Sequence, residues 1–114
     1  MLFSILEGGR VLDKKDKKRH TAVIIWKRGP EGGIMVLVQN TRSLDPRFEN
    51  QPSRTGFPGG GEKPEDHENP IETGIREVWE ETSLYFNGGC IKTLCVVEDR
   101  ETIKTFLLIN RGCF

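Results

Sequence analysis

The stretch "FPGGGEKPEDHENPIETGIREVWEETSL", residues Phe57 to Leu84, opens with three glycines after a proline and closes on a segment dense in glutamate. Pro70 suits the first turn of a helix and Asn69 is a suitable N-cap, so the stretch predicts a helix that runs to about Ser83. Glutamates this close together repel one another unless something positive is held among them. The identity of that positive group is the main question that the segment raises.

The predicted helix has one acidic side. At about 100° per residue, the carboxylates of Glu77, Glu80 and Glu81 share an arc of about 100°. Arg76 lies beside this arc, where its guanidinium can pair with one carboxylate and hold it in place. The opposite side is apolar and is predicted to pack on a sheet; it comprises Ile71, Ile75, Val78 and Trp79.

A solvated outer face is one interpretation of this acidic side, because glutamate favours helices and is commonly exposed. Three features favour a bound cation instead. The acids are not interleaved with lysines, Glu77 and Glu81 form a like-charged pair one turn apart, and Glu80 and Glu81 lie late in the helix, where the dipole disfavours anions. Hard oxygen ligands of this kind indicate Mg²⁺ or Mn²⁺.

The three glycines ahead of the helix, Gly59, Gly60 and Gly61, allow a backbone to approach another group closely. They predict a loop, either a flexible turn or one whose N–H groups shape a phosphate site. The spacing matches neither a P-loop nor the G-x-G-x-x-G fingerprint of dinucleotide-binding proteins. A glycine loop beside an acidic, metal-binding helix suits phosphate that is held through a divalent ion.

Taken together, the glycines, Glu68 and the run "REVWEET" resemble the Nudix box, G-x5-E-x7-R-E-U-x-E-E-x-G-U, in which U is a bulky apolar residue. The spacing from Glu68 onward agrees with this pattern, and the match covers about a quarter of the chain. One extra residue separates Gly61 from Glu68, and Ser83 stands where the family has glycine, a position that needs a tight turn after the helix. The chain also ends at Phe114, before the further strand and helix with which Nudix domains usually continue.

The resemblance implies a single Nudix-like domain over residues 1–114, an α/β/α sandwich with a mixed sheet that lacks the usual C-terminal strand and helix. It implies hydrolysis of a nucleoside diphosphate linked to another group, X, by water attack on phosphorus with the help of Mg²⁺ or Mn²⁺. Arg76 is implied to be a structural strut to a glutamate within the catalytic set. That set comprises Arg76, Glu77, Glu80 and Glu81, and the implied metal ligands are Glu68, Glu77, Glu80, Glu81 and the carbonyl of Gly60.

Substrate contacts are predicted in the long loop at residues 43–54 and beside it. Arg42, Arg54 and the three glycines at 59–61 are the candidate substrate-binding residues, and Arg47 and Phe48 are weaker ones; ordinary surface loop residues are the alternative. Glu98 and Glu101 are weak candidates for an additional base. The sequence does not distinguish an oxidised nucleotide from a dinucleoside polyphosphate, a nucleotide sugar or a capped RNA end.

The rest of the chain reads as strands and turns. Apolar and β-branched runs predict four main strands and one short one, whereas residues 13–20 read as a polar loop. The first two main strands are expected to form a hairpin around a turn at 28–33, and residues 98–101 form a second turn. The predicted strands are 21–26, 34–41, 55–57, 90–97 and 102–110.

Composition restricts the partners. The chain of 114 residues is 35% hydrophobic and 30% charged, and its 17 basic residues balance its 17 acidic ones. Overall charge therefore gives no reason to expect nucleic acid or a membrane surface, and a nucleotide-type small molecule is the expected ligand. The start of the chain does not resemble a signal peptide, and three cysteines without ligand spacing suggest free thiols in a cytoplasmic protein rather than a zinc site.

Three hypotheses about function follow. The first is the metal-dependent hydrolase, and the second is a non-catalytic Nudix-fold module that binds nucleotide or protein. The third is an unrelated α/β domain whose helix merely has an acidic surface. Because a domain without its usual last elements leaves a sheet edge or an apolar face open, we also expect a homodimer.

Overall fold

The β-branched run at 21–26 forms the centre of the longest strand, β1 (Lys18–Arg28), in the computed structural model, which describes residues 16–41, 47 and 54–114. Strand β1 pairs in parallel with β7 (Thr102–Asn110), from Lys18 opposite Thr102 to Trp26 opposite Asn110. Residues 18–20 therefore belong to a strand, and the prediction of a loop there is wrong. Polar residues extend the strand because β7 supplies backbone hydrogen-bond partners along its whole length.

The predicted hairpin is confirmed, but its second strand is shorter than the sequence suggested. Strand β2 (Ile34–Val36) pairs antiparallel with β1 across a turn in which the N–H of Gly29 donates to the carbonyl of Gly33 at 2.6 Å. The N–H of Leu37 donates to the carbonyl of Ile25 at 2.9 Å, and the chain then leaves β1. The single strand predicted at 34–41 is thus split, and β3 (Gln39–Thr41) pairs with β4 (Arg54–Gly56) in a separate two-stranded sheet.

The three glycines form a short strand, β5 (Gly59–Gly61), rather than the predicted loop. Strand β5 pairs antiparallel with β1, with Gly60 opposite Thr21. A Cβ atom on Gly59 would collide with the backbone of Thr21, so only glycine allows this approach. Because glycine is a poor strand former, the residue pattern does not predict this pairing.

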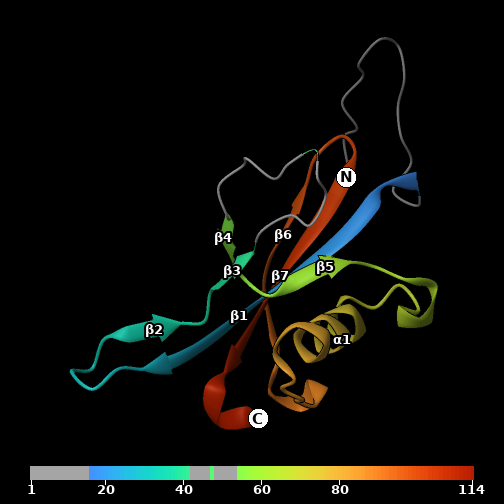
Figure 1. Cartoon of the computed structure of the whole chain (residues 1–114). Coiled ribbons are helices and arrows are strands. Elements are labelled where there is room, and N and C mark those ends of the chain that lie inside the picture. Colours follow the sequence, from blue (N-terminus) through green and yellow to red (C-terminus); the bar gives the residue numbers. More distant parts are fainter. Residues whose placement is uncertain (1–15, 42–46, 48–53) are drawn as a thin grey trace.

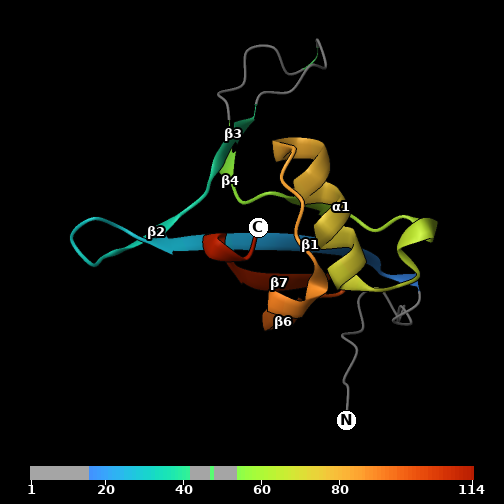
Figure 2. The same cartoon turned by 90° about the horizontal axis from the view of Figure 1, so that it is seen from below.

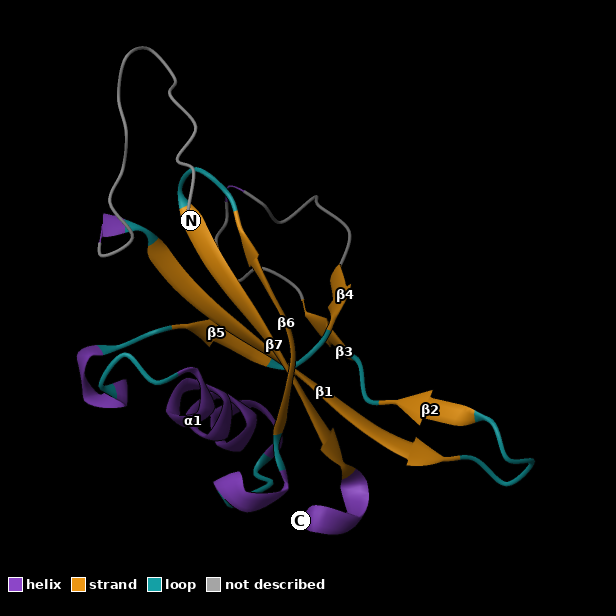
Figure 3. Cartoon of the chain, turned by 180° about the vertical axis from the view of Figure 1, so that it is seen from behind, coloured by secondary structure: helices purple, strands orange, loops and turns teal. Residues whose placement is uncertain are grey.

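The edge strand of the sheet beyond β7 is β6 (Lys92–Glu98). It pairs antiparallel with β7 and has a bulge between Thr93 and Cys95. A short 3₁₀ helix, Gly88–Cys90, precedes it, so the strand begins two residues later than predicted. The sheet order is β2-β1-β7-β6, and β5 also pairs with β1 (Figure 3). The sheet is mixed because β1 and β7 run parallel while the other neighbours run antiparallel.

Helix α1 (Pro70–Thr82) lies against one face of this sheet (Figures 1 and 2). The core between the two layers consists of fully buried apolar side chains, namely Val23, Ile25, Val78, Phe86, Leu107 and Ile109. Gly74 makes close packing possible, because a Cβ there would lie 2.9 Å from Leu107 and 3.1 Å from Val23. The mixed α/β class is confirmed, and within the described ranges the α-helical layer covers one face only.

Candidate active site

Local sequence signals at the start of α1 act as expected. The side chain of Asn69 accepts a hydrogen bond from the N–H of Ile71 at 3.0 Å, and Pro70 occupies the first turn. The helix ends at Thr82, and Ser83 adopts the left-handed conformation with φ of 60°. This is the tight turn that the family pattern assigns to glycine.

The buried side of α1 is rotated from the predicted apolar stripe toward the acidic side. Thr73, Gly74, Glu77 and Val78 are buried, whereas Trp79 is 54% exposed. The prediction that Trp79 packs on the sheet is therefore wrong. The rotation follows from the small residues at the contact between α1 and the sheet. Gly74 lets the sheet approach the helix closely, and the glycines of β5 leave room for a carboxylate.

Glu77 occupies that room and is only 9% exposed. A Cβ on Gly60 would lie 2.5 Å from the Glu77 carboxylate, so this acid packs directly on the backbone of β5. Burial raises the pKa of Glu77, the hydrogen bond from Arg76 opposes that rise, and the nearby carboxylates of Glu80 and Glu81 add to it. The three carboxylates thus affect one another electrostatically, as the helix wheel predicted.

Arg76 is the centre of a hydrogen-bonded network. Its guanidinium donates to both carboxylate oxygens of Asp66, at 3.1 and 2.9 Å, and to the carbonyl of Gly61 at 2.8 Å. It also donates to Glu77 at 2.9 Å and to Glu80 at 3.3 Å. The hydrogen bond to Asp66, as the largest cause, and the hydrogen bond to Glu77 raise the pKa of Arg76. Arg76 therefore joins α1 to β5 and to the segment between them.

Asp66 is the residue of this network that sequence reasoning missed. It is 3% exposed and accepts hydrogen bonds from the Thr73 hydroxyl and the Lys63 N–H, both at 2.9 Å. The hydrogen bond from Arg76 is the largest cause that lowers the pKa of Asp66 to about 2. Glu68, which the resemblance implies as a metal ligand, is exposed and has no hydrogen bond to any residue that the structure describes.

The other two acids of the helix have different partners. The side chain of Glu80 is 44% exposed and lies 3.9 Å from the ammonium of Lys63. One carboxylate oxygen of Glu81 accepts from the Gln39 amide at 2.6 Å and from the N–H of Gly59 at 3.0 Å. Glu81 therefore ties α1 to β3 and β5, so Glu77 and Glu81 both contact the glycine strand, while Glu80 is joined to Glu77 through Arg76.

The chemistry of this donor set suits a hard divalent cation, since it offers carboxylate oxygens beside a backbone carbonyl in a partly buried place. The side chains are not arranged around one point, however, and no three acids, histidines or cysteines within the described ranges have the geometry of a metal site. The guanidinium of Arg76 bridges Glu77 and Glu80, and Glu81 is held by its own donors. Side-chain rotation is needed before these groups share a cation.

The remaining predicted residues lie in several different places. Arg42, Phe48 and the side chain of Arg54 lie outside the described residues, while Gly59, Gly60 and Gly61 border the acids as strand β5. Glu98 forms an ion pair with Lys17 at 2.8 Å, and Lys17 is buried even though its segment was predicted to be a polar loop. Glu101 is exposed in the turn before β7. All three cysteines are free.

A mixed sheet that carries a helix with an Arg-Glu-x-x-Glu-Glu run, braced on a glycine strand, defines the class of protein. The NUDIX domain model matches residues 18–111 of this chain, which therefore belongs to the Nudix family. No curated protein sequence matches the chain significantly.

Solved structures share the fold at low sequence identity. T. brucei MERS1 in its apo form has a TM-score of 0.65 at 16% identity, over 84% of this chain and 39% of that one. A MutT/nudix family protein from Enterococcus faecalis has a TM-score of 0.64 at 18% identity, over 89% of this chain and 39% of that one. The NUDIX domain of Shewanella oneidensis NrtR, solved with ADP ribose, has a TM-score of 0.60 at 18% identity, over 87% and 65%.

These likenesses show the fold alone. The chain spans about two fifths of the length of the first two solved structures that it matches. MERS1 has also been solved in complex with RNA, so the fold is compatible with more than one kind of ligand. Among the described residues, none of the helices is long and apolar enough to span a membrane.

Proposed function

We propose that the chain is a divalent-metal-dependent hydrolase that cleaves the phosphoric anhydride bond of a nucleoside diphosphate linked to another group, X. The observation that carries this proposal is that Glu77 packs on Gly60 and Glu81 accepts from the N–H of Gly59 on the same strand. Arg76, which is tied to Asp66, joins Glu77 to Glu80. Arg76 offsets part of the negative charge of Glu77 and Glu80, but Glu81 adds to the repulsion, and an acidic surface helix gives no reason to bury Glu77.

Glu80 and Glu81 would be the main ligands of Mg²⁺ or Mn²⁺, and Glu77 or the Gly60 carbonyl would complete the set. When bound, the cation neutralises the diphosphate, activates water and stabilises the leaving oxygen. If Glu77 is not a ligand, its carboxylate would be the base that accepts a proton from the attacking water, since it packs directly on the glycine strand. Arg76 is a positioning residue: its contacts are to protein groups, and it holds Glu77 and Glu80 toward β5.

The proposal is tested by product release from a panel of nucleoside diphosphate derivatives with Mg²⁺ or Mn²⁺. We expect wild type to release nucleoside monophosphate, and Glu80→Gln to lose at least a hundredfold in kcat, in line with the loss of an electrostatic group at the reacting atoms. Glu72→Gln is the matched control, because Glu72 is an exposed acid in the first turn of the same helix. Equal release by wild type and Glu80→Gln would refute the assignment.

A second candidate function is nucleotide binding without turnover. It is favoured by the partners that the acids have here, because Arg76 and Lys63 neutralise Glu80 while Gln39 and Gly59 hold Glu81. The likeness to the NrtR domain that was solved with ADP ribose also supports it. A micromolar Kd for nucleotide, with no product release across the panel, would support nucleotide binding without turnover over the hydrolase. Under either proposal the ligand is a small nucleotide, and the free cysteines support a cytoplasmic location.

A further inference from the structure

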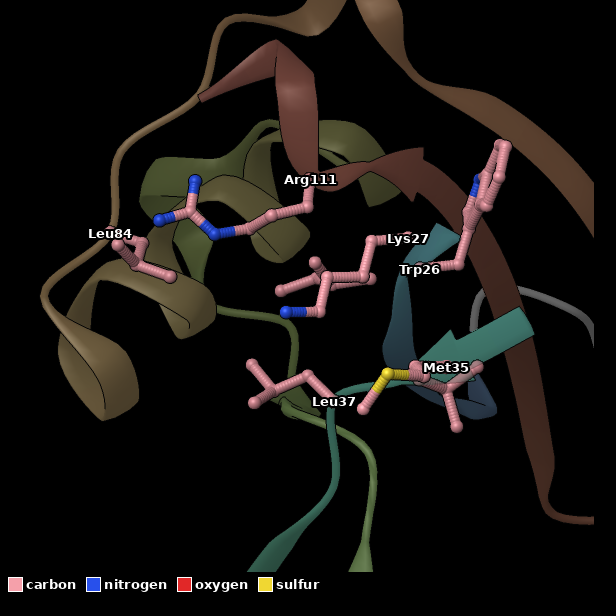
Figure 4. Close-up of a pocket in the computed structure, with 8 residues that line it drawn as sticks. Trp26, Lys27, Met35, Leu37, Leu84 and Arg111 are labelled. Carbon is pink, nitrogen blue, oxygen red and sulfur yellow. The ribbon is translucent and has the colours of Figure 1, made fainter. Parts of the chain in front are cut away.

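A pocket of about 300 Å³ lies between the β1–β2 hairpin and the segments that follow α1 and β7. Its apolar walls include Ile25, Met35, Leu37 and Leu84, and its two charged lining residues are Lys27 and Arg111. Figure 4 shows the ammonium of Lys27 and the guanidinium of Arg111 both extending toward the side on which Leu84 lies, whereas the ring of Trp26 points away. Neither Lys27 nor Arg111 has a role in the function proposed above.

The walls of this pocket leave apolar surface open to solvent. Met35 is 48% exposed and Leu37 is 38% exposed, although both lie next to the fully buried core residue Ile25. Leu37 is held in place because its N–H donates to the carbonyl of Ile25. An apolar ligand group would remove this surface from water, at about 25 cal/mol per Å².

Among the described residues, no acidic residue that lines the pocket neutralises the positive charges of Lys27 and Arg111. In the part of the chain that the structure describes, neither Lys27 nor Arg111 forms an ion pair, and no acidic residue lines the pocket. The guanidinium carbon of Arg111 lies 5.2 Å from the centroid of the Phe114 ring, a cation–π contact that does not neutralise its charge. Two cations on an apolar floor match a ligand that combines an apolar group with about two negative charges, and a phosphomonoester carries that charge near neutral pH.

Two pocket residues are close in sequence to groups at Glu81. Leu37 lies two residues before Gln39, whose amide donates to Glu81 at 2.6 Å. Leu84 follows Glu81 by three residues. The pocket is therefore connected to Glu81 by short stretches of chain on both sides.

We propose that this pocket is a subsite for a phosphomonoester on an apolar carbon group, with Lys27 and Arg111 as its anion-binding residues. This inference rests on the proposed hydrolase function where it assigns the phosphomonoester to one end of the substrate. If the chain is that hydrolase, group X is apolar and carries its own terminal phosphate. Lys27 and Arg111 then bind this terminal phosphate away from the bond that is cleaved.

The test uses phenyl phosphate as the probe, without metal, so that no turnover takes place and the acidic cluster has no cation through which to hold phosphate. Binding is measured by titration calorimetry on the full chain, with inorganic phosphate and phenol as comparison ligands. The variants are Lys27→Ala, Arg111→Ala and the charge-preserving Arg111→Lys. Lys92→Ala removes the same charge from an exposed position on β6 and is the matched control.

We expect phenyl phosphate to bind more tightly than inorganic phosphate or phenol, and Kd to rise about tenfold or more in Lys27→Ala and Arg111→Ala. Arg111→Lys should retain most of the affinity, and Lys92→Ala should leave it unchanged. Unchanged binding in both pocket variants would overturn the subsite. Binding that depends on Lys27 and Arg111 in a chain that hydrolyses nothing would refute the hydrolase and leave the subsite standing.

Discussion

At the scale of single residues, the pair formed by Asp66 and Arg76 determines where the acids of α1 lie. Two hydrogen bonds join the two side chains across ten positions of sequence. The chain can bring them together because it reverses at His67 and Glu68, which both adopt left-handed backbone conformations, with φ of 54° and 58°. The sequence gives no sign of this reversal at non-glycine residues, and the family pattern drew attention to Glu68 instead.

Asp66→Asn should lower the free energy of unfolding at pH 7 by about 2 kcal/mol, which is what a pKa drop from 3.8 to about 2 represents. Because the folded-state pKa is depressed, this stabilisation is fully present above about pH 4 and is lost as pH falls through about 2. Urea unfolding of wild type and variant at several values of pH checks this, since the two stabilities should converge toward pH 2.

Glu65→Gln is the control for that experiment, because Glu65 is an exposed acid in the same short helix, Pro64–Asp66. It should change stability at pH 7 by less than about 0.5 kcal/mol. A constant gap between wild type and Asp66→Asn from pH 7 to pH 2 would show that the carboxylate of Asp66 is not the titrating group.

Gly60→Ala should disturb the acids, because its Cβ would lie 2.5 Å from the carboxylate of Glu77. We expect a stability loss of about 1–3 kcal/mol, as for overpacking elsewhere, together with a loss of metal-dependent activity. Gly61→Ala is the matched control on the same strand, where the nearest atom would be 3.8 Å away. Thermal melts and the product-release assay compare the two variants, and equal effects of both would contradict the packing of Glu77 on Gly60.

At the scale of elements, the signals that predicted correctly are local ones. Helix α1 was predicted because its cap, its first-turn proline and its periodicity all lie within its own sequence, and β7 was predicted because its apolar run is long. Two features of the fold depend on partners that are distant in sequence. The predicted strand at 34–41 is divided after Leu37 because β3 pairs with β4, and the glycines form strand β5 because they pair with β1. The rotation of α1 onto Glu77 depends on those same glycines, so the sequence placed the acids on one side of the helix but not against β5.

Ser83→Gly should stabilise the chain by about 1 kcal/mol, because Ser83 ends α1 in a left-handed conformation that a side chain disfavours. Ser83→Ala keeps a Cβ and should bring no such gain. Chemical denaturation measures both variants. A Ser83→Gly variant no more stable than Ser83→Ala would mean that the turn carries no strain.

At the scale of the whole molecule, strand β6 presents an apolar edge. Leu94, Val96 and Val97 are each more than half exposed, on the outermost strand of the sheet. We expect this edge to pair with a second copy of the chain, so light scattering should show a dimer at high concentration and a monomer for Val96→Lys. A monomeric wild type at millimolar concentration would contradict this expectation.

The central claim is that the glutamates of α1 are gathered to hold a divalent cation. The most direct measurement is the melting temperature of the chain as Mn²⁺ or Mg²⁺ is added to millimolar concentration, for wild type, Glu80→Gln and Glu72→Gln. A cation that binds only the folded state, at a concentration of about 100 times its Kd, adds about 2.7 kcal/mol to the free energy of unfolding. We therefore predict that the melting temperature rises by several degrees in wild type and Glu72→Gln, and by little or nothing in Glu80→Gln. A melting temperature that does not respond in wild type, or that rises equally in Glu80→Gln, would contradict the claim.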